Sequence, residues 1–101
     1  MAQSMRVVLA FFLHDRLLCR DTIEIGPQEA EHTVAGDDGY AFVISSKYEE
    51  PACPLFIQCF QEGQMVFRSA MRMGVHNSDD WEAVSLAEPY ELCFKCLLID
   101  A

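Results

Sequence analysis

Hydrophobic and polar residues alternate along three segments of the chain, at residues 17–25, 64–73 and 90–99. Because successive side chains of a β-strand point to opposite faces, this period of two predicts strands with one buried face. The expected buried faces are Leu17, Cys19, Ile23 and Ile25 in the first segment, Met65, Phe67, Ser69, Met71 and Met73 in the second, and Tyr90, Leu92, Phe94, Cys96 and Leu98 in the third. The same alternation places Leu18 on the exposed face of the first strand.

Turn-forming residues divide the remainder of the chain into further short strands. Apolar runs predict strands at residues 5–13, 40–46 and 55–60, and a weaker pattern predicts one at 81–86. The polar stretch at residues 29–32 is compatible with a short edge strand. Turns or loops are predicted at residues 14–16, 35–39, 47–54, 61–63 and 74–80, with a short helix as an alternative at 77–80.

The spacing of these turns indicates the fold class. Turns recur roughly every eight to twelve residues and helical periodicity is nearly absent, which favours an antiparallel arrangement over βαβ units. A length of 101 residues suits one domain, and 51% hydrophobic residues suffice for a core. We therefore expect a single all-β domain, residues 1–101, folded as an antiparallel β-sandwich or small barrel of about seven to eight strands with at most one short helix.

Charge limits the classes of ligand. Sixteen acidic residues against seven basic ones give a formal charge of −9, which repels phosphate backbones and anionic lipid. Direct binding to nucleic acid or to a membrane is therefore not expected. The excess acid either keeps the protein soluble or attracts a basic partner. Three acidic pairs fall in predicted loops and form the candidate partner-binding set: Asp37, Asp38, Glu49, Glu50, Asp79 and Asp80. Solvated turns explain these pairs better than Ca²⁺ binding does, since the alternating spacing of a calcium loop is missing.

The leading functional hypothesis is a non-enzymatic protein-binding module whose acidic loops engage a protein partner of basic character. Inhibitors, immunity proteins and nucleic-acid mimics share this profile. The sequence contains no G-x-S-x-G, H-E-x-x-H, P-loop or G-x-G-x-x-G motif, so an enzyme is not expected. No cofactor is expected either.

A metal-binding protein is the first alternative. Met71 and Met73 share a strand face and precede His76, a soft ligand set suited to Cu(I). The spacing, with Trp81 nearby, resembles the M-x-M plus His and Trp arrangement of periplasmic copper-binding small barrels, over about ten residues. A methionine stripe is more often part of a core, and that interpretation is preferred.

The cysteines offer a second kind of metal site and indicate the compartment. Zinc would need convergent thiolates, yet Cys93 and Cys96 are three residues apart in a predicted strand and should face opposite ways. Five cysteines, an odd number, fit a reducing compartment better than a disulfide framework. The apolar run 7–13 is followed by no small-x-small cleavage site, so a cytoplasmic protein is expected.

The last predicted strand, 90–99, is apolar on both faces at its end because Leu97 and Ile99 lie opposite the buried set. Three elements could cover this second apolar face: the neighbouring strand 7–13, another protein, or a second copy in a homodimer. A self-assembling structural subunit that associates through sheet edges is therefore the other alternative function.

Overall fold

Eight β-strands make up most of the protein in the computed structural model, which describes residues 2–100. The strands are β1 (Ala2–Leu13), β2 (Arg16–Ile25), β3 (Ala30–Ala35), β4 (Tyr40–Ser46), β5 (Ala52–Gln61), β6 (Gln64–Gly74), β7 (Glu82–Ser85) and β8 (Tyr90–Asp100). A 3₁₀ turn, η1 (Asp37–Gly39), precedes β4. The predicted all-β class is confirmed, and within residues 2–100 the alternative helix at 77–80 does not form. Nor do these residues contain a helix with the length and apolar character needed to cross a bilayer.

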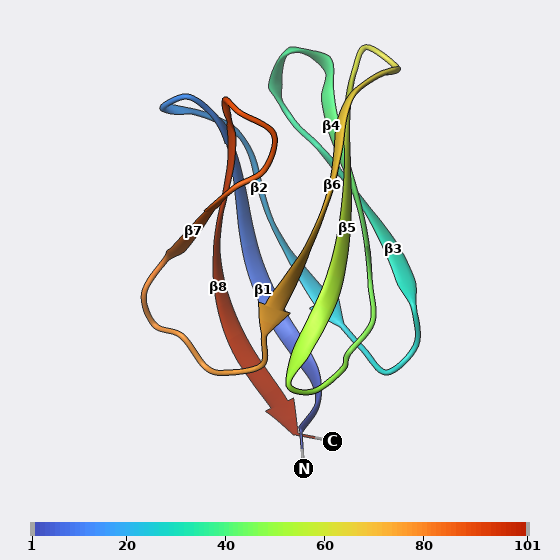
Figure 1. Cartoon of the computed structure of the whole chain (residues 1–101), viewed down its shortest axis with the longest axis vertical. Helices are drawn as coiled ribbons and strands as arrows, with labels where there is room; N and C mark the ends of the chain where they lie inside the picture. Colours follow the sequence, from blue (N-terminus) through green and yellow to red (C-terminus); the bar gives the residue numbers. More distant parts are fainter. Residues whose placement is uncertain (1, 101) are drawn as a thin grey trace.

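The strands form two antiparallel four-stranded sheets, ordered β2-β1-β8-β7 and β3-β4-β5-β6, that pack face to face as a sandwich (Figure 1). The chain starts in the first sheet, builds the whole of the second from β3 to β6, and returns to the first with β7 and β8. The first and last strands are therefore neighbours, paired along their length from Ala2↔Asp100 to Leu13↔Tyr90.

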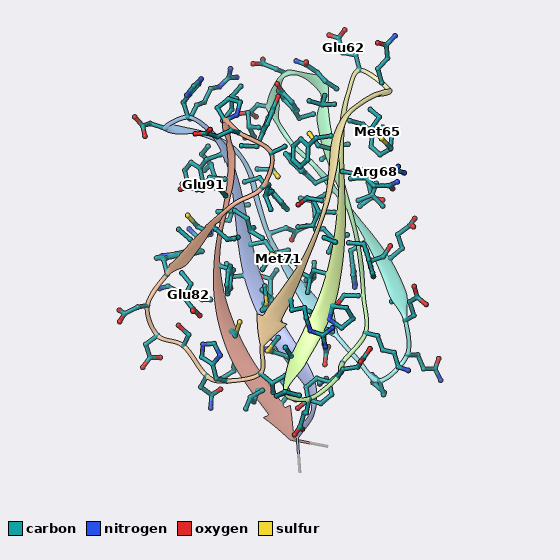
Figure 2. All side chains as sticks on the ribbon, viewed as in Figure 1. Glu62, Met65, Arg68, Met71, Glu82 and Glu91 are labelled. Atoms are coloured by element: carbon teal, nitrogen blue, oxygen red, sulfur yellow. The ribbon has the colours of Figure 1, made fainter. Side chains whose placement is uncertain are left out.

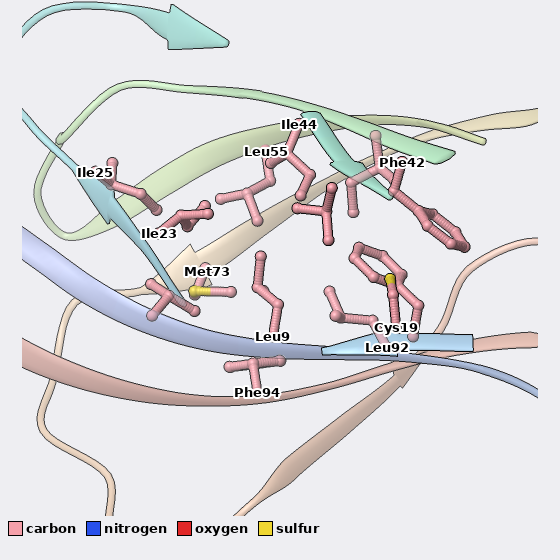
Figure 3. Close-up of a cluster of buried hydrophobic side chains, with 14 of the residues drawn as sticks. Leu9, Cys19, Ile23, Ile25, Phe42, Ile44, Leu55, Met73, Leu92 and Phe94 are labelled. Atoms are coloured by element: carbon pink, nitrogen blue, oxygen red, sulfur yellow. The ribbon is translucent and has the colours of Figure 1, made fainter. Parts of the chain in front are cut away.

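Apolar side chains from the inner faces of both sheets fill the space between them (Figure 3). Phe11 of β1 stacks on Phe42 of β4, with ring centroids 4.0 Å apart, and so joins the two sheets. Towards the η1 end, Tyr40 and Tyr90 also meet across the sandwich, with their hydroxyl oxygens 3.0 Å apart. The apolar alternation read from the sequence thus corresponds to the inner faces of the two sheets.

Two bulges overturn part of the predicted alternation. Between β1 and β2 the register shifts after Phe11, so that Leu18 is an extra residue between the partners of Phe11 and Phe12. Leu18 and Cys19 are consequently both buried, whereas Leu17 is 44% exposed, so the predicted orientations of Leu17 and Leu18 were wrong. A bulge inserts one residue and turns the side chains beyond it to the other face.

The second bulge lies at the start of β6. Cys59 pairs with Phe67 but Phe60 pairs with Met65, which leaves one residue of β6 unpaired. Met65 is 48% exposed, and its predicted place on the inner face was wrong. From Phe67 to Met73 the predicted alternation is confirmed, and Figure 2 shows Met71 and Arg68 on opposite sides of β6.

The predicted boundary between the loop at 47–54 and the strand at 55–60 also changes. The loop expected at 47–54 ends earlier, since β5 begins at Ala52 and includes Pro54. Pro54 lies just beyond the last residue of β5 that pairs with β4, Leu55, and its carbonyl oxygen accepts a hydrogen bond from the Ser46 hydroxyl. A proline is tolerated at such a position because the ladder to β4 has already ended.

The final strand is central in its sheet, between β1 and β7. Its predicted inner face is confirmed, with Leu92, Phe94 and Cys96 buried. Leu97, on the outer face, is 51% exposed, so the neighbouring strand does not cover it.

Candidate functional site

The excess of acidic residues lies in the connections between strands. The eight strands hold six acidic and six basic residues, whereas the connections hold ten acidic residues and one basic residue, Lys47. The whole formal charge of −9 therefore belongs to the connections, which lie at the two ends of the sandwich (Figure 1). A basic surface would be attracted to these ends and not to the sheet faces.

The six acidic residues predicted from the sequence all lie in connections but not at one end. At one end lie Asp37 and Asp38, and at the other lie Glu49, Glu50, Asp79 and Asp80. The length of β4, seven residues or about 20 Å, separates the two groups. The structure therefore brings four of the six carboxylates to a shared end.

We call Glu49, Glu50, Asp79 and Asp80 the acidic end. They come from two connections, β4–β5 and β6–β7, that are joined by a hydrogen bond from the Val75 N–H to the Pro51 carbonyl oxygen (3.0 Å). The β6–β7 connection is also fixed to β8, because the Ser78 N–H donates to the Cys96 carbonyl oxygen (2.9 Å). These backbone bonds hold the two acidic pairs in a defined relation to each other.

Side-chain bonds order the acidic end further. The Tyr48 hydroxyl donates to Glu50 Oε2 (2.7 Å), and the Ser78 hydroxyl donates to the Asp80 carbonyl oxygen (2.7 Å). Among residues 2–100, none of the four carboxylates of the acidic end forms an ion pair. No basic side chain of the described residues therefore contacts these carboxylates directly.

The opposite end presents its carboxylates differently. Asp38 forms an ion pair with Arg16 of the β1–β2 hairpin, and both side chains are more than half exposed. Gly36 brings this turn close to β2, since a Cβ at Gly36 would stand 2.8 Å from the Leu18 carbonyl oxygen. The pairing of Asp38 halves the free charge that the Asp37 and Asp38 pair offers to a partner.

The candidate copper ligands lie in unlike surroundings. Met73 is buried in the core, where the Cys96 thiol donates to its sulfur (3.6 Å), while Met71 is partly buried. His76 is at the surface, with Nε2 2.9 Å from Glu82 Oε2 and Nδ1 3.1 Å from the Gly74 carbonyl oxygen. Both ring nitrogens already have oxygen neighbours within residues 2–100. Copper binding by this set stays a prediction.

Zinc has no obvious ligand set in the described part of the chain. No group of three or more His, Cys, Asp or Glu side chains is arranged there to hold a metal ion. Cys96 points into the core and Cys93 lines an outer-face cleft, as the strand position of this C-x-x-C pair predicted.

The cysteine thiols are poor nucleophiles in this environment. Burial raises the pKa of Cys19 to about 12 and the pKa values of Cys59 and Cys96 to about 11. Burial also raises the pKa of Cys53, and that of Cys93, where the nearby Glu91 carboxylate adds to the effect. All five thiols are free and are expected to be protonated near neutral pH.

Sequence reasoning missed a cleft on the outer face of the β2-β1-β8-β7 sheet. Trp81, from the β6–β7 connection, folds over this face, with the Arg20 guanidinium 5.2 Å and the Lys95 ammonium 4.9 Å from its ring centroid. The cleft beside it has a volume of about 380 Å³ and is lined by Ala10, Phe12, Leu17, Arg20, Trp81 and Cys93. An outward-facing Leu17 would have indicated the cleft. The period-two pattern placed Leu17 on the inner face instead, because the pattern carries no sign of the bulge at Leu18.

Sequence reasoning also missed the outer face of the other sheet. Phe56, in the middle of β5, is 54% exposed there although its strand is internal in the sheet. The signal was present in the sequence, because strict alternation from the buried Leu55 and Ile57 places Phe56 outside.

Comparisons with known proteins add no relative from which a role can be transferred. No family model, no curated protein and no solved structure matches this chain.

Proposed function

We propose that this chain is a non-enzymatic protein-binding module that captures a basic protein partner through its acidic end. The observation that carries the proposal is the separation of charge, with neutral strands and connections that hold the entire formal charge of −9. The five free, high-pKa thiols suit a reducing compartment, which supports a cytoplasmic protein. Asp37 and Asp38, at the opposite end of the sandwich, lie outside this proposed surface.

The geometry of the acidic end supports this role over simple solvation. Its two connections are held together by the Val75 to Pro51 hydrogen bond, so its carboxylates are presented without the ordering cost of two independent loops. A concentrated acidic surface attracts a basic partner during approach and raises association rates by roughly ten- to a thousand-fold over a neutral surface. We expect association with the partner to slow and weaken as the ionic strength rises.

Affinity capture from the native source tests the proposal. The immobilised wild-type protein is compared with a variant neutralised at the acidic end, Glu49→Gln, Glu50→Gln, Asp79→Asn and Asp80→Asn. The wild type should retain a basic protein at low salt and release it at high salt, whereas the variant should not retain it. Association rates measured with that protein should fall on the order of ten-fold in the variant.

A matched variant separates a defined site from bulk charge. Asp15→Asn, Asp37→Asn, Glu62→Gln and Glu88→Gln remove the same number of charges from the opposite end, where the β1–β2, β3–β4, β5–β6 and β7–β8 connections lie. This variant should still capture the partner. Equal loss in both variants, or capture that depends only on the opposite end, would contradict the assignment.

A further inference from the structure

The outer face of the β3-β4-β5-β6 sheet has an ordered arrangement of charge and shape. One row of paired residues crosses the four strands: Glu31, Ser45, Phe56 and Ala70. Phe56 thus stands between two small side chains, on β4 and β6. The residues around it line a broad hollow of about 710 Å³, which reaches from Glu29 and Glu31 at one edge to Arg68 at the other.

The charges of this face lie at its two edges and have opposite sign. Glu29 and Glu31 lie at the β3 edge, and Arg68 and Arg72 lie on β6 at the other edge. Among the side chains that the structure describes, none of these four forms an ion pair, although Arg72 donates to the Ala52 carbonyl oxygen (3.3 Å). The face is therefore neutral as a whole on a protein that is otherwise strongly acidic.

We propose that this face is a self-complementary interface, which packs face to face against the same face of a second copy of the chain. A two-fold axis parallel to the strands, between β4 and β5, would set β3 of each copy over β6 of the other. Phe56 would then project towards the partner's Ser45, where the hollow accepts its ring. A two-fold interface joins the same patch on both subunits, so every contact occurs twice.

The register of the strands brings opposite charges together in this arrangement. On β6, Arg72 lies two residues from Ala70, and Glu29, just before the start of β3, lies two residues from Glu31 on the same side of the crossing row. The partner's Glu29 would therefore meet Arg72, and the partner's Glu31 would lie between Arg68 and Arg72. Four carboxylates and four guanidinium groups pair across one dimer.

The area of this face indicates how strongly two copies should associate. Four strands about 4.8 Å apart, over about seven residues, cover on the order of 400 Å² of sheet per copy. Because a standard interface buries about 800 Å² per partner, roughly twice this area, the dimer should be weak and transient.

A competing mode, in which the β6 edges pair, fits the charges less well. Antiparallel pairing of two β6 strands about Ala70 would set Arg68 directly opposite the partner's Arg72, and like charges in such pairs are destabilising. The face-to-face mode pairs the same arginines with carboxylates. The two modes therefore differ in whether Glu29 and Glu31 matter.

Charge reversal distinguishes these modes. Sedimentation equilibrium of the wild type up to about 1 mM should show a monomer–dimer equilibrium. The variants Arg68→Glu/Arg72→Glu and Glu29→Arg/Glu31→Arg should each be monomeric, because each sets like charges face to face. Mixed together, they should form a heterodimer in which every facing pair has opposite sign.

Three results would each contradict the proposed face-to-face dimer. A monomeric wild type at about 1 mM overturns the proposal. So does dimerisation of Glu29→Arg/Glu31→Arg alone, which is what β6 edge pairing predicts and what bulk charge predicts, since that variant is closer to neutrality. Failure of the mixture to associate overturns the proposal as well.

A second pair of variants tests the central contact. Phe56→Ser should weaken dimerisation at least ten-fold, on the scale of losing a large buried anchor. Leu97→Ser removes a similarly exposed apolar side chain, 51% against 54%, from the other sheet and should leave dimerisation unchanged. Equal effects of the two substitutions would assign the association to general hydrophobicity and overturn the proposal. Circular dichroism of each variant checks that it is folded.

Discussion

Replacement of Gly36 by alanine should destabilise the fold because this residue has no room for a side chain. An added Cβ would stand 2.8 Å from the Leu18 carbonyl oxygen and 3.1 Å from the Cys19 Cβ. Both neighbours belong to the bulge of β2, whose side chains are buried. The nearest atom is backbone, so a rotamer change cannot relieve the contact. The β3–β4 turn would have to move away from β2.

The loss of folding free energy in Gly36→Ala follows from this overpacking. An extra carbon in a tightly packed site typically costs about 1 to 3 kcal/mol. For a domain of this length, each kcal/mol lowers the thermal midpoint by roughly 4 to 8 °C, so a drop of about 4 to 24 °C is expected. The displaced turn carries Asp37 and Asp38, so the Arg16–Asp38 ion pair should weaken as well.

Thermal and urea denaturation of Gly36→Ala measure this effect, and Gly26→Ala is its control. A Cβ at Gly26 would meet nothing within 4 Å, and its backbone is outside the left-handed region, so alanine there should be neutral or stabilising by about 0.4 to 1 kcal/mol. If Gly36→Ala were as stable as the wild type, the close approach of the turn to the bulge would be refuted.

Two further predictions concern the rest of the molecule. Each of the substitutions Trp81→Ala and Arg20→Ala should lower the free energy of unfolding modestly. The double variant should lose about 0.5 to 1 kcal/mol less than the sum of the two single losses, because the cation–π contact is lost only once. Additive losses in urea denaturation would contradict the contact. The contribution of the buried thiols to stability should be level up to about pH 9 and fall as pH rises from there. Burial raises the pKa of Cys19 to about 12 and of Cys59 to about 11 from 9.0, so the folded state favours the neutral thiols and this contribution is lost at alkaline pH. A flat unfolding free energy to about pH 10.5 would show that these thiols are not buried.

The strands were predictable from the sequence because their signals are local. Residues 40–46 match β4 without an error, since glycine and aspartate precede it and residues 40–44 form an unbroken apolar run. The misplaced side chains, Leu17, Leu18 and Met65, all lie at bulges. A bulge depends on a partner strand and changes the alternation by one residue, so a single segment carries no sign of it.

The candidate site was predictable only in part for a related reason. Acidic pairs in turns are visible in the sequence, and all six residues do lie in connections. Which pairs share an end depends on the order of the strands, and that is a property of long-range pairing. The same holds for the β3-β4-β5-β6 face, where Glu31 and Ala70 are aligned only because four strands pair in register.

Capture of a basic partner and dimerisation should reinforce each other if both proposals hold. A two-fold axis parallel to the strands keeps the acidic ends of both copies on the same side of the dimer. The β4–β5 connection leaves the sheet beside this axis, so Glu49 and Glu50 of the two copies would lie near one another and repel. A basic ligand bound between them relieves that repulsion, and linkage requires that the ligand then tightens the dimer by the factor by which dimerisation tightens ligand binding.

An oligolysine peptide is a suitable probe of this coupling. It should strengthen wild-type dimerisation on the order of ten-fold in sedimentation equilibrium. The effect should vanish when Glu49→Gln and Glu50→Gln remove the facing charges, and Phe56→Ser should bind the peptide more weakly while remaining monomeric. Peptide binding that leaves the monomer–dimer equilibrium unchanged would show that the acidic ends of the two copies do not meet, and would reject the proposed orientation of the axis.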